Sequence, residues 1–64
     1  MSWHYQIRRK EIDDTVLYDI VEVYTDPYVW TVQGMRPCGD TPEEVIIELQ
    51  RMLKDAKAYP VLEE

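Results

Sequence analysis

The segment that runs from residue 39 to residue 57 constrains the fold most, because its start and stop signals agree on one helix. Thr41 is a good N-cap, and Pro42 takes the first helical position, where a missing N–H costs nothing. Glu44 lies three residues after Thr41 and completes a capping box. A residue before proline is disfavoured in helical backbone, so Tyr59-Pro60 ends the pattern. The sequence therefore predicts one capped helix that ends before Tyr59.

An apolar stripe along this helix predicts the face that packs against the rest of the chain. Its members recur at helical spacing, with Ile46 at the border, and are Val45, Leu49, Met52, Leu53 and Ala56. Ile47 points away from the stripe. We interpret it either as a lone exposed isoleucine or as a contact for a partner.

Three segments before the helix have the character of β-strands. Residues 3–8 alternate between apolar and polar side chains, as a half-buried strand does. Residues 17–24 are rich in β-formers, and residues 28–33 follow a tight turn at Thr25-Asp26-Pro27. The polar connection from Lys10 to Thr15 contains Asp13-Asp14 and predicts a hairpin loop.

The middle strand has an ambiguous inward face. Tyr18 and Ile20 favour one phase, whereas Val21 and Val23 favour the other. A β-bulge between Ile20 and Val23 would reconcile the two phases, and so would a strand with two partly apolar faces.

These elements predict an α+β fold in one small domain, residues 1–64. Its architecture is a three-stranded antiparallel β-meander with one C-terminal α-helix packed on one face, in the order β-β-β-α. The expected core comprises Trp3, Tyr5, Ile7, Ile20, Trp30, Val32, Val45, Leu49, Met52, Leu53 and Ala56. With one helix available, we expect the second face of the sheet to stay open, which antiparallel sheets tolerate. An open face and exposed edges also favour a partner or a homodimer.

Length and cysteine content narrow the kind of site and the cellular compartment that we expect. A chain of 64 residues buries a modest fraction of its surface and supports a binding surface more readily than a deep cleft. Its single cysteine excludes an intrachain disulfide and fits a reducing compartment. No apolar run approaches the roughly 20 residues of a membrane span, and the N-terminal residues lack the pattern of a signal peptide. These features predict a cytoplasmic protein without membrane association.

Charge is distributed unevenly along a chain whose net charge is −6. Residues 1–10 contain three basic side chains, Arg8, Arg9 and Lys10, which we interpret as a solvated strand edge. Residues 11–50 contain ten acidic side chains and one basic one, Arg36. So acidic a chain repels phosphate, which disfavours direct nucleic-acid binding and favours a basic protein partner.

Six acidic residues cluster on the hairpin regions and form the predicted partner-binding site. They are Glu11, Asp13, Asp14, Asp19, Glu22 and Asp26. Side chains at i and i+2 of a strand lie about 7 Å apart on one face. A row of carboxylates at such spacing would imitate a phosphate backbone and occupy a basic groove. The alternative is an ordinary solvated acidic surface.

No catalytic, metal or cofactor constellation is present in the sequence. His4 is the only histidine and has no evident nucleophile beside it. Cys38 precedes the helix N-terminus, where the field can activate a thiol, although a small residue in a turn is the simpler interpretation. The carboxylate pairs lack the spacing of a calcium loop. We therefore expect no enzyme, no bound metal and no cofactor.

Two resemblances follow from these residues. The strands followed by Gly39-Asp40-Thr41-Pro42-Glu43-Glu44-Val45 and an amphipathic helix resemble the N-terminal domain of HicB-like antitoxins, over about residues 16–57. In that family a G-D-T-x-E-E-A segment opens the helix after a meander, and a DNA-binding segment usually follows, which we do not expect residues 58–64 to provide. Small size, acidity and the missing catalytic residues also make the chain similar in type to phage inhibitors such as anti-CRISPR and DNA-mimic proteins.

The function predicted first is a non-enzymatic acidic interaction module, an inhibitor that binds a basic, nucleic-acid-binding surface of a partner protein. The alternative, which the resemblance to HicB-like antitoxins implies, is a module that neutralises a small ribonuclease toxin. A third class, a small enzyme that uses Cys38, requires a thiol that alkylates quickly at neutral pH.

Overall fold

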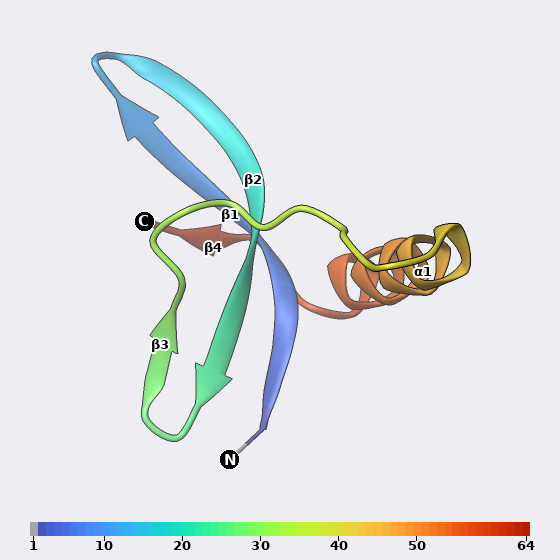
Figure 1. Ribbon diagram of the computed structural model, residues 1–64. Helices are drawn as coiled ribbons and strands as arrows, with labels where there is room; N and C mark the ends of the chain where they lie inside the picture. The colour runs from blue at the N-terminus through green and yellow to red at the C-terminus, as the bar shows by residue number, and fades with distance from the viewer. Residues whose placement is uncertain (1) are drawn as a thin grey trace.

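A computed structural model describes residues 2–64 and has an α+β fold with four strands and one helix. The strands are β1 (Trp3–Ile12), β2 (Thr15–Thr25), β3 (Tyr28–Trp30) and β4 (Leu62–Glu63), and the helix is α1 (Pro42–Ala58). The sheet order is β3-β2-β1-β4, with β4 parallel to β1 and the other pairs antiparallel (Figure 1). The predicted meander and helix are confirmed, whereas the fourth strand, made by the C-terminal segment, is an addition.

The helix begins and ends where its signals predict. Thr41 Oγ1 accepts a hydrogen bond from the Glu44 amide at 3.2 Å, and Glu44 Oε1 accepts from the Asp40 amide at 2.9 Å. The Tyr59 amide donates to the Asp55 carbonyl, 3.2 Å away, and closes the last turn. A Cβ on Gly39 would lie 2.6 Å from the Glu44 Cβ, so this loop position requires glycine.

The first two strands form a long hairpin. Residues from Trp3 to Ile12 pair one to one with residues from Tyr24 back to Thr15, so β2 contains no bulge. Of the two interpretations of the middle strand, two partly apolar faces is therefore the correct one. The loop is only Asp13-Asp14, both with positive φ, as a two-residue I′ turn requires.

The residues with the least exposure lie on both faces of the sheet. Tyr5 faces α1, but Val21 and Val23 are fully buried on the opposite face, which they share with buried Gln6 and Arg8. The expectation of an open second face is therefore wrong. The backbone after β3 and the C-terminal residues cover it, because Gln6 Nε2 donates to the Pro60 carbonyl and Arg8 Nη1 donates to the Thr31 and Val32 carbonyls.

Several expected core residues are exposed. Val32 is 83% exposed because β3 ends at Trp30 and the chain bends away from β2 before returning at Met35. Leu49 and Leu53 are 49% and 57% exposed, so only Met52 of the helical stripe is buried. The other expected members are half-buried: Trp3, Ile7, Ile20, Trp30, Val45 and Ala56.

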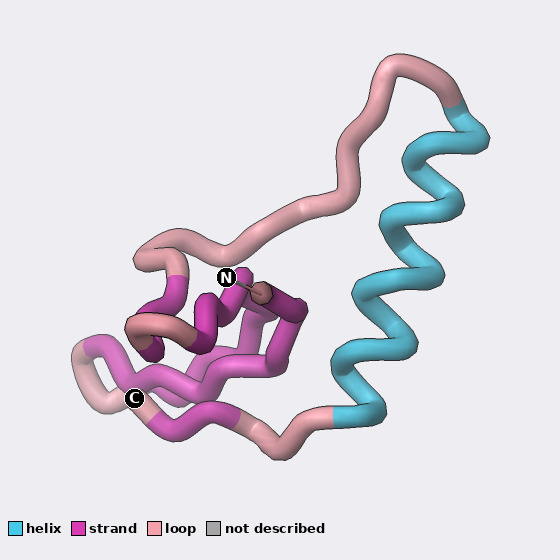
Figure 2. Tube along the Cα trace, turned by 90° about the horizontal axis from the view of Figure 1, so that it is seen from below, coloured by secondary structure: helices cyan, strands magenta, loops and turns pink. Residues whose placement is uncertain are grey.

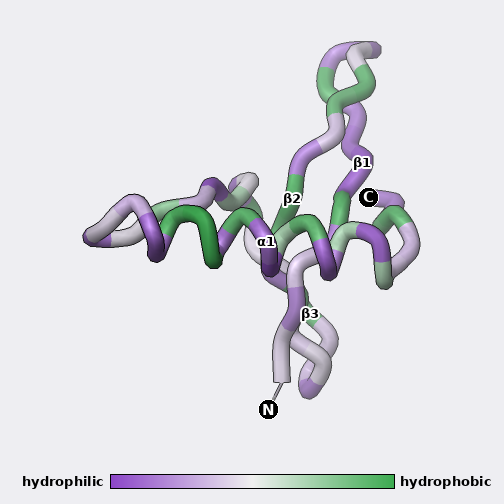
Figure 3. Tube along the Cα trace, turned by 90° about the vertical axis from the view of Figure 1, so that its right-hand side faces the viewer, coloured by the Kyte–Doolittle hydropathy of each residue, from purple (hydrophilic) through white to green (hydrophobic). Residues whose placement is uncertain are grey.

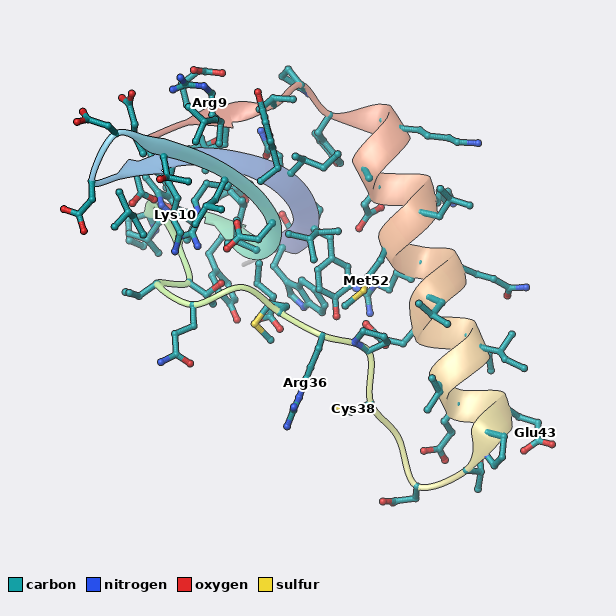
Figure 4. All side chains as sticks on the ribbon, turned by 90° about the horizontal axis from the view of Figure 1, so that it is seen from above. Arg9, Lys10, Arg36, Cys38, Glu43 and Met52 are labelled. Carbon is teal, nitrogen blue, oxygen red and sulfur yellow. The ribbon has the colours of Figure 1, made fainter. Side chains whose placement is uncertain are left out.

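The helix lies beside β1 and projects beyond the strands. Its C-terminal half approaches the sheet, while the N-terminal half stands clear of it at the end of the long β3–α1 connection (Figure 2). Met52 points into the gap between helix and strands, whereas Glu43 points away from the sheet (Figure 4). Among residues 2–64, no helix has the length and apolar character needed to cross a membrane.

Polar contacts fix the docking of the helix on β1. Asp55 Oδ2 accepts from the Tyr5 amide at 3.0 Å, and the Arg51 guanidinium lies 4.0 Å from the centre of the Trp3 ring. The Tyr5 hydroxyl donates to Glu48 Oε1. Burial and this hydrogen bond both raise the pKa of Tyr5, because each disfavours the phenolate.

The raised pKa of Tyr5 predicts an alkaline loss of stability. In the unfolded chain the phenol titrates near its ordinary value of about 10, and in the folded chain it titrates higher. The contribution is therefore complete below pH 10 and declines as pH rises above it. Urea denaturation of the wild type between pH 9 and 11 should show a steeper loss than the same series on Tyr5→Phe. Parallel slopes for the two proteins would contradict this assignment.

Candidate protein-interaction surface

Arg8 is buried at the centre of a polar network, which corrects its interpretation as part of a solvated edge. Its side chain is 1% exposed. Asp19 accepts two hydrogen bonds from it, at 3.0 Å from Nε to Oδ1 and 2.6 Å from Nη2 to Oδ2. Arg8 Nη1 also donates to the Val32 carbonyl at 2.8 Å, and to the Thr31 carbonyl and Glu64 Oε2 at 3.3 Å each. The hydrogen bond to Asp19 raises the pKa of Arg8 further, so this guanidinium stays charged.

The two neighbouring cations are also engaged within the chain. Arg9 lies 3.8 Å from Glu63, and Lys10 lies 4.0 Å from Asp19. The basic run 8–10 is thus satisfied by acids from β2 and the C-terminus. Among the described residues, Glu11, Asp13 and Asp14 at the end of the hairpin make no ion pair with these or other cations.

The six predicted site acids fall into three places. Glu11, Asp13 and Asp14 are exposed together at the tip of the β1–β2 hairpin. Asp19 accepts hydrogen bonds from Arg8, and Glu22 accepts a hydrogen bond from the Tyr24 hydroxyl at 2.5 Å. Asp26 lies in the β2–β3 turn, at the opposite end of β2. The structure thus gathers three of the six, and does not align all six in one row.

The two acids on β2, Asp19 and Glu22, lie on opposite faces of the sheet. Asp19 and Glu22 are three residues apart on a regular strand, so their side chains point to opposite faces. The Glu22 hydrogen bond raises the pKa of Tyr24. A Cβ on Gly34 would lie 2.8 Å from Asp19 Oδ2, so the glycine lets the chain approach this carboxylate closely.

Large apolar side chains lie beside the acidic tip on both faces of the hairpin, with Val16 and Tyr18 on one face and Ile12 and Leu17 on the other, and sequence reasoning missed them. Four are exposed: Ile12, Val16, Leu17 and Tyr18. The far part of the hairpin projects beyond the rest of the sheet, above β4 in Figure 1. The projection follows from strand lengths that the sequence analysis did not predict, since β1 and β2 pair over ten residues while β3 has three residues and β4 has two. We call residues 11–18 the arm tip.

The two remaining candidates lie in different elements, His4 in β1 and Cys38 in the β3–α1 connection. The His4 ring stacks on the Tyr59 ring with centroids 3.6 Å apart, and its Nε2 lies 2.9 Å from Gln6 Oε1. Cys38 is exposed in the β3–α1 connection, near Arg36, which extends away from the sheet (Figure 4). Residues 2–64 contain no group of His, Cys, Asp and Glu side chains arranged to hold a metal ion.

The arm tip is the exposed, projecting end of the β1–β2 hairpin. It combines free carboxylates with exposed apolar and aromatic side chains, and aromatic side chains are enriched at protein interfaces. Comparisons of the chain with protein-family models, with curated proteins and with solved structures each gave no match.

Proposed function

We propose that this protein is a non-enzymatic interaction module that binds a basic surface of another protein through its arm tip. The observation that carries this is the exposure of Glu11, Asp13 and Asp14 beside Ile12, Val16, Leu17 and Tyr18 on a projecting hairpin. Carboxylates steer the approach to a basic partner, and the apolar side chains supply the area that is buried on contact.

The expected consequence of binding is inhibition. Basic protein surfaces are the ones that bind nucleic acid, since they neutralise phosphates. An acidic module that occupies such a surface competes with the nucleic acid for the same cations. The net charge of −6 supports this role, because it keeps the module itself off nucleic acid.

The test is capture from a bacterial lysate at low and high salt with a matched pair of variants. Asp13→Asn/Asp14→Asn removes two tip charges and keeps side chains that tolerate positive φ. Asp26→Asn/Asp40→Asn removes the same charge from two exposed positions elsewhere. We expect the wild type and the second variant to retain the same basic protein, and the tip variant to lose it. Adding the wild-type chain should then release nucleic acid from that protein.

Three results would contradict the proposal. Equal retention by both variants would place binding elsewhere on the molecule. Equal loss by both would indicate a general charge effect without a defined surface. Retention of a protein whose nucleic-acid binding is unaffected by the added chain would remove the inhibitory role.

A further inference from the structure

The exposed side of α1 carries an apolar stripe that the chain itself leaves uncovered. Ile46, Leu49 and Leu53 are 53%, 49% and 57% exposed, and with half-buried Ala56 they follow one another at spacings of three, four and three residues. This is the spacing at which two helices pack along a common seam. The apolar residues run along the helix in Figure 3. We call these four residues the helix seam.

The chain exposes more surface than a compact monomer of its mass. A compact monomer of 7.7 kDa exposes about 4,300 Å², whereas this chain exposes 4868 Å². The difference is roughly 500 Å² per copy, similar to the share that each partner buries in a weak protein–protein interface, up to about 600 Å².

The charges beside the seam identify the occupant as a second copy. Glu43 and Lys57 flank its two ends on the same side, both are exposed, and neither makes an ion pair within residues 2–64. In an antiparallel pair that sets Leu49 against Leu53 of the second copy, Glu43 lies next to Lys57 of the second copy, twice by symmetry. Antiparallel helix dipoles add to this preference.

We propose that the protein forms a twofold-symmetric homodimer through antiparallel packing of the helix seam. The N-terminal half of α1 stands clear of the strands, so a second helix can approach it without displacing the sheet (Figure 2). Met52 stays on the sheet side and is not part of the interface. The arm tips lie on a different part of the molecule from the seam and remain free.

Sedimentation equilibrium of the full chain tests this directly. The mass should rise from 7.7 kDa toward twice that value over the range from about 10 µM to about 1 mM. Leu49→Gln/Leu53→Gln should weaken the dimer by at least about tenfold. Ile47→Gln is the matched control, since Ile47 is 62% exposed on another side of the same helix, and its effect should stay within about twofold. Circular dichroism checks that each variant keeps its helix.

Charge-reversal variants of Glu43 and Lys57 test the antiparallel orientation. This test does not require the Leu49 and Leu53 variants to fold. Glu43→Lys alone and Lys57→Glu alone should each weaken self-association about three- to tenfold, because like charges then face each other. An equimolar mixture, with one partner labelled with nitrogen-15, should give mixed dimers by native mass spectrometry at wild-type strength.

Each contrary result overturns the proposal. A mass of 7.7 kDa across the range excludes the dimer. A dimer that Ile47→Gln weakens more than Leu49→Gln/Leu53→Gln is formed by another surface. Charge variants that do not combine preferentially exclude the antiparallel seam, and a seam covered only by a different captured protein excludes the second copy.

Discussion

Replacing Arg8 with alanine should lower the free energy of unfolding by about 3–5 kcal/mol, since this removes the buried partner of an ion pair. The change leaves the Asp19 carboxylate and the Val32 carbonyl without the donor that now satisfies them. A chain of this size is stable by only about 3–10 kcal/mol in total. Urea denaturation followed by circular dichroism should therefore show a midpoint far below that of the wild type.

A double-mutant cycle separates the pair from the packing around it. Arg8→Met/Asp19→Leu removes both charges and keeps apolar volume, so it should be more stable than either single variant. Arg9→Ala is the matched control, because Arg9 is 30% exposed and lies 3.8 Å from Glu63, and it should cost less than about 1 kcal/mol. A loss below about 1 kcal/mol for Arg8→Met would show that water replaces the guanidinium at little cost.

Replacing Met52 with alanine should have the second largest effect, a loss of about 2–5 kcal/mol. Met52 is the only buried side chain of α1, and it fills the gap between the helix and the strands. Without it, the helix is held by the contacts of Asp55, Glu48 and Arg51 to β1. We expect lower helix content by circular dichroism together with the lower stability.

Leu53→Ala is the comparison that makes the Met52 result informative. Replacing Leu53 with alanine changes helix propensity about as little as replacing Met52 does. Leu53 is 57% exposed, however, so the loss of its side chain should lower the free energy of unfolding by no more than about 0.5 kcal/mol. Both variants are measured at the lowest practical concentration, where self-association does not contribute. Equal losses for the two variants would mean that the helix packs by its whole apolar stripe.

The contrast between these two residues shows what the sequence could predict. Local signals decided the helix, and Thr41 and Tyr59-Pro60 placed its ends correctly, because capping depends on neighbours in the chain. The periodic stripe showed which face of the helix is apolar, but the position and rotation of the helix on β1 decide which of these residues are buried. Polar contacts from Glu48, Asp55 and Arg51 to β1 orient the helix so that Met52 faces the sheet, while Leu49 and Leu53 face outward.

Arg8 escaped prediction for a related reason. Three consecutive bases are usually solvated, and nothing within the run distinguishes the first from the others. Its ligands come from Asp19, from the carbonyls after β3 and from Glu64, all of which are distant in sequence. The acidic cluster was divided by the same contacts. Glu11, Asp13 and Asp14 remain a coherent group because the hairpin turn alone brings them together.

The parallel pairing of β4 with β1 has a consequence for how the molecule opens. Two residues of β4 close a connection that spans most of the chain, whereas β1 and β2 meet through a two-residue turn. Long closures cost more entropy and form later, so β4 should be the first strand to detach in local unfolding. Amide hydrogens in the β1–β2 ladder would then exchange slowly, while those at β4 exchange quickly. Each such opening briefly admits water to one side of the guanidinium that the rest of the sheet keeps dry.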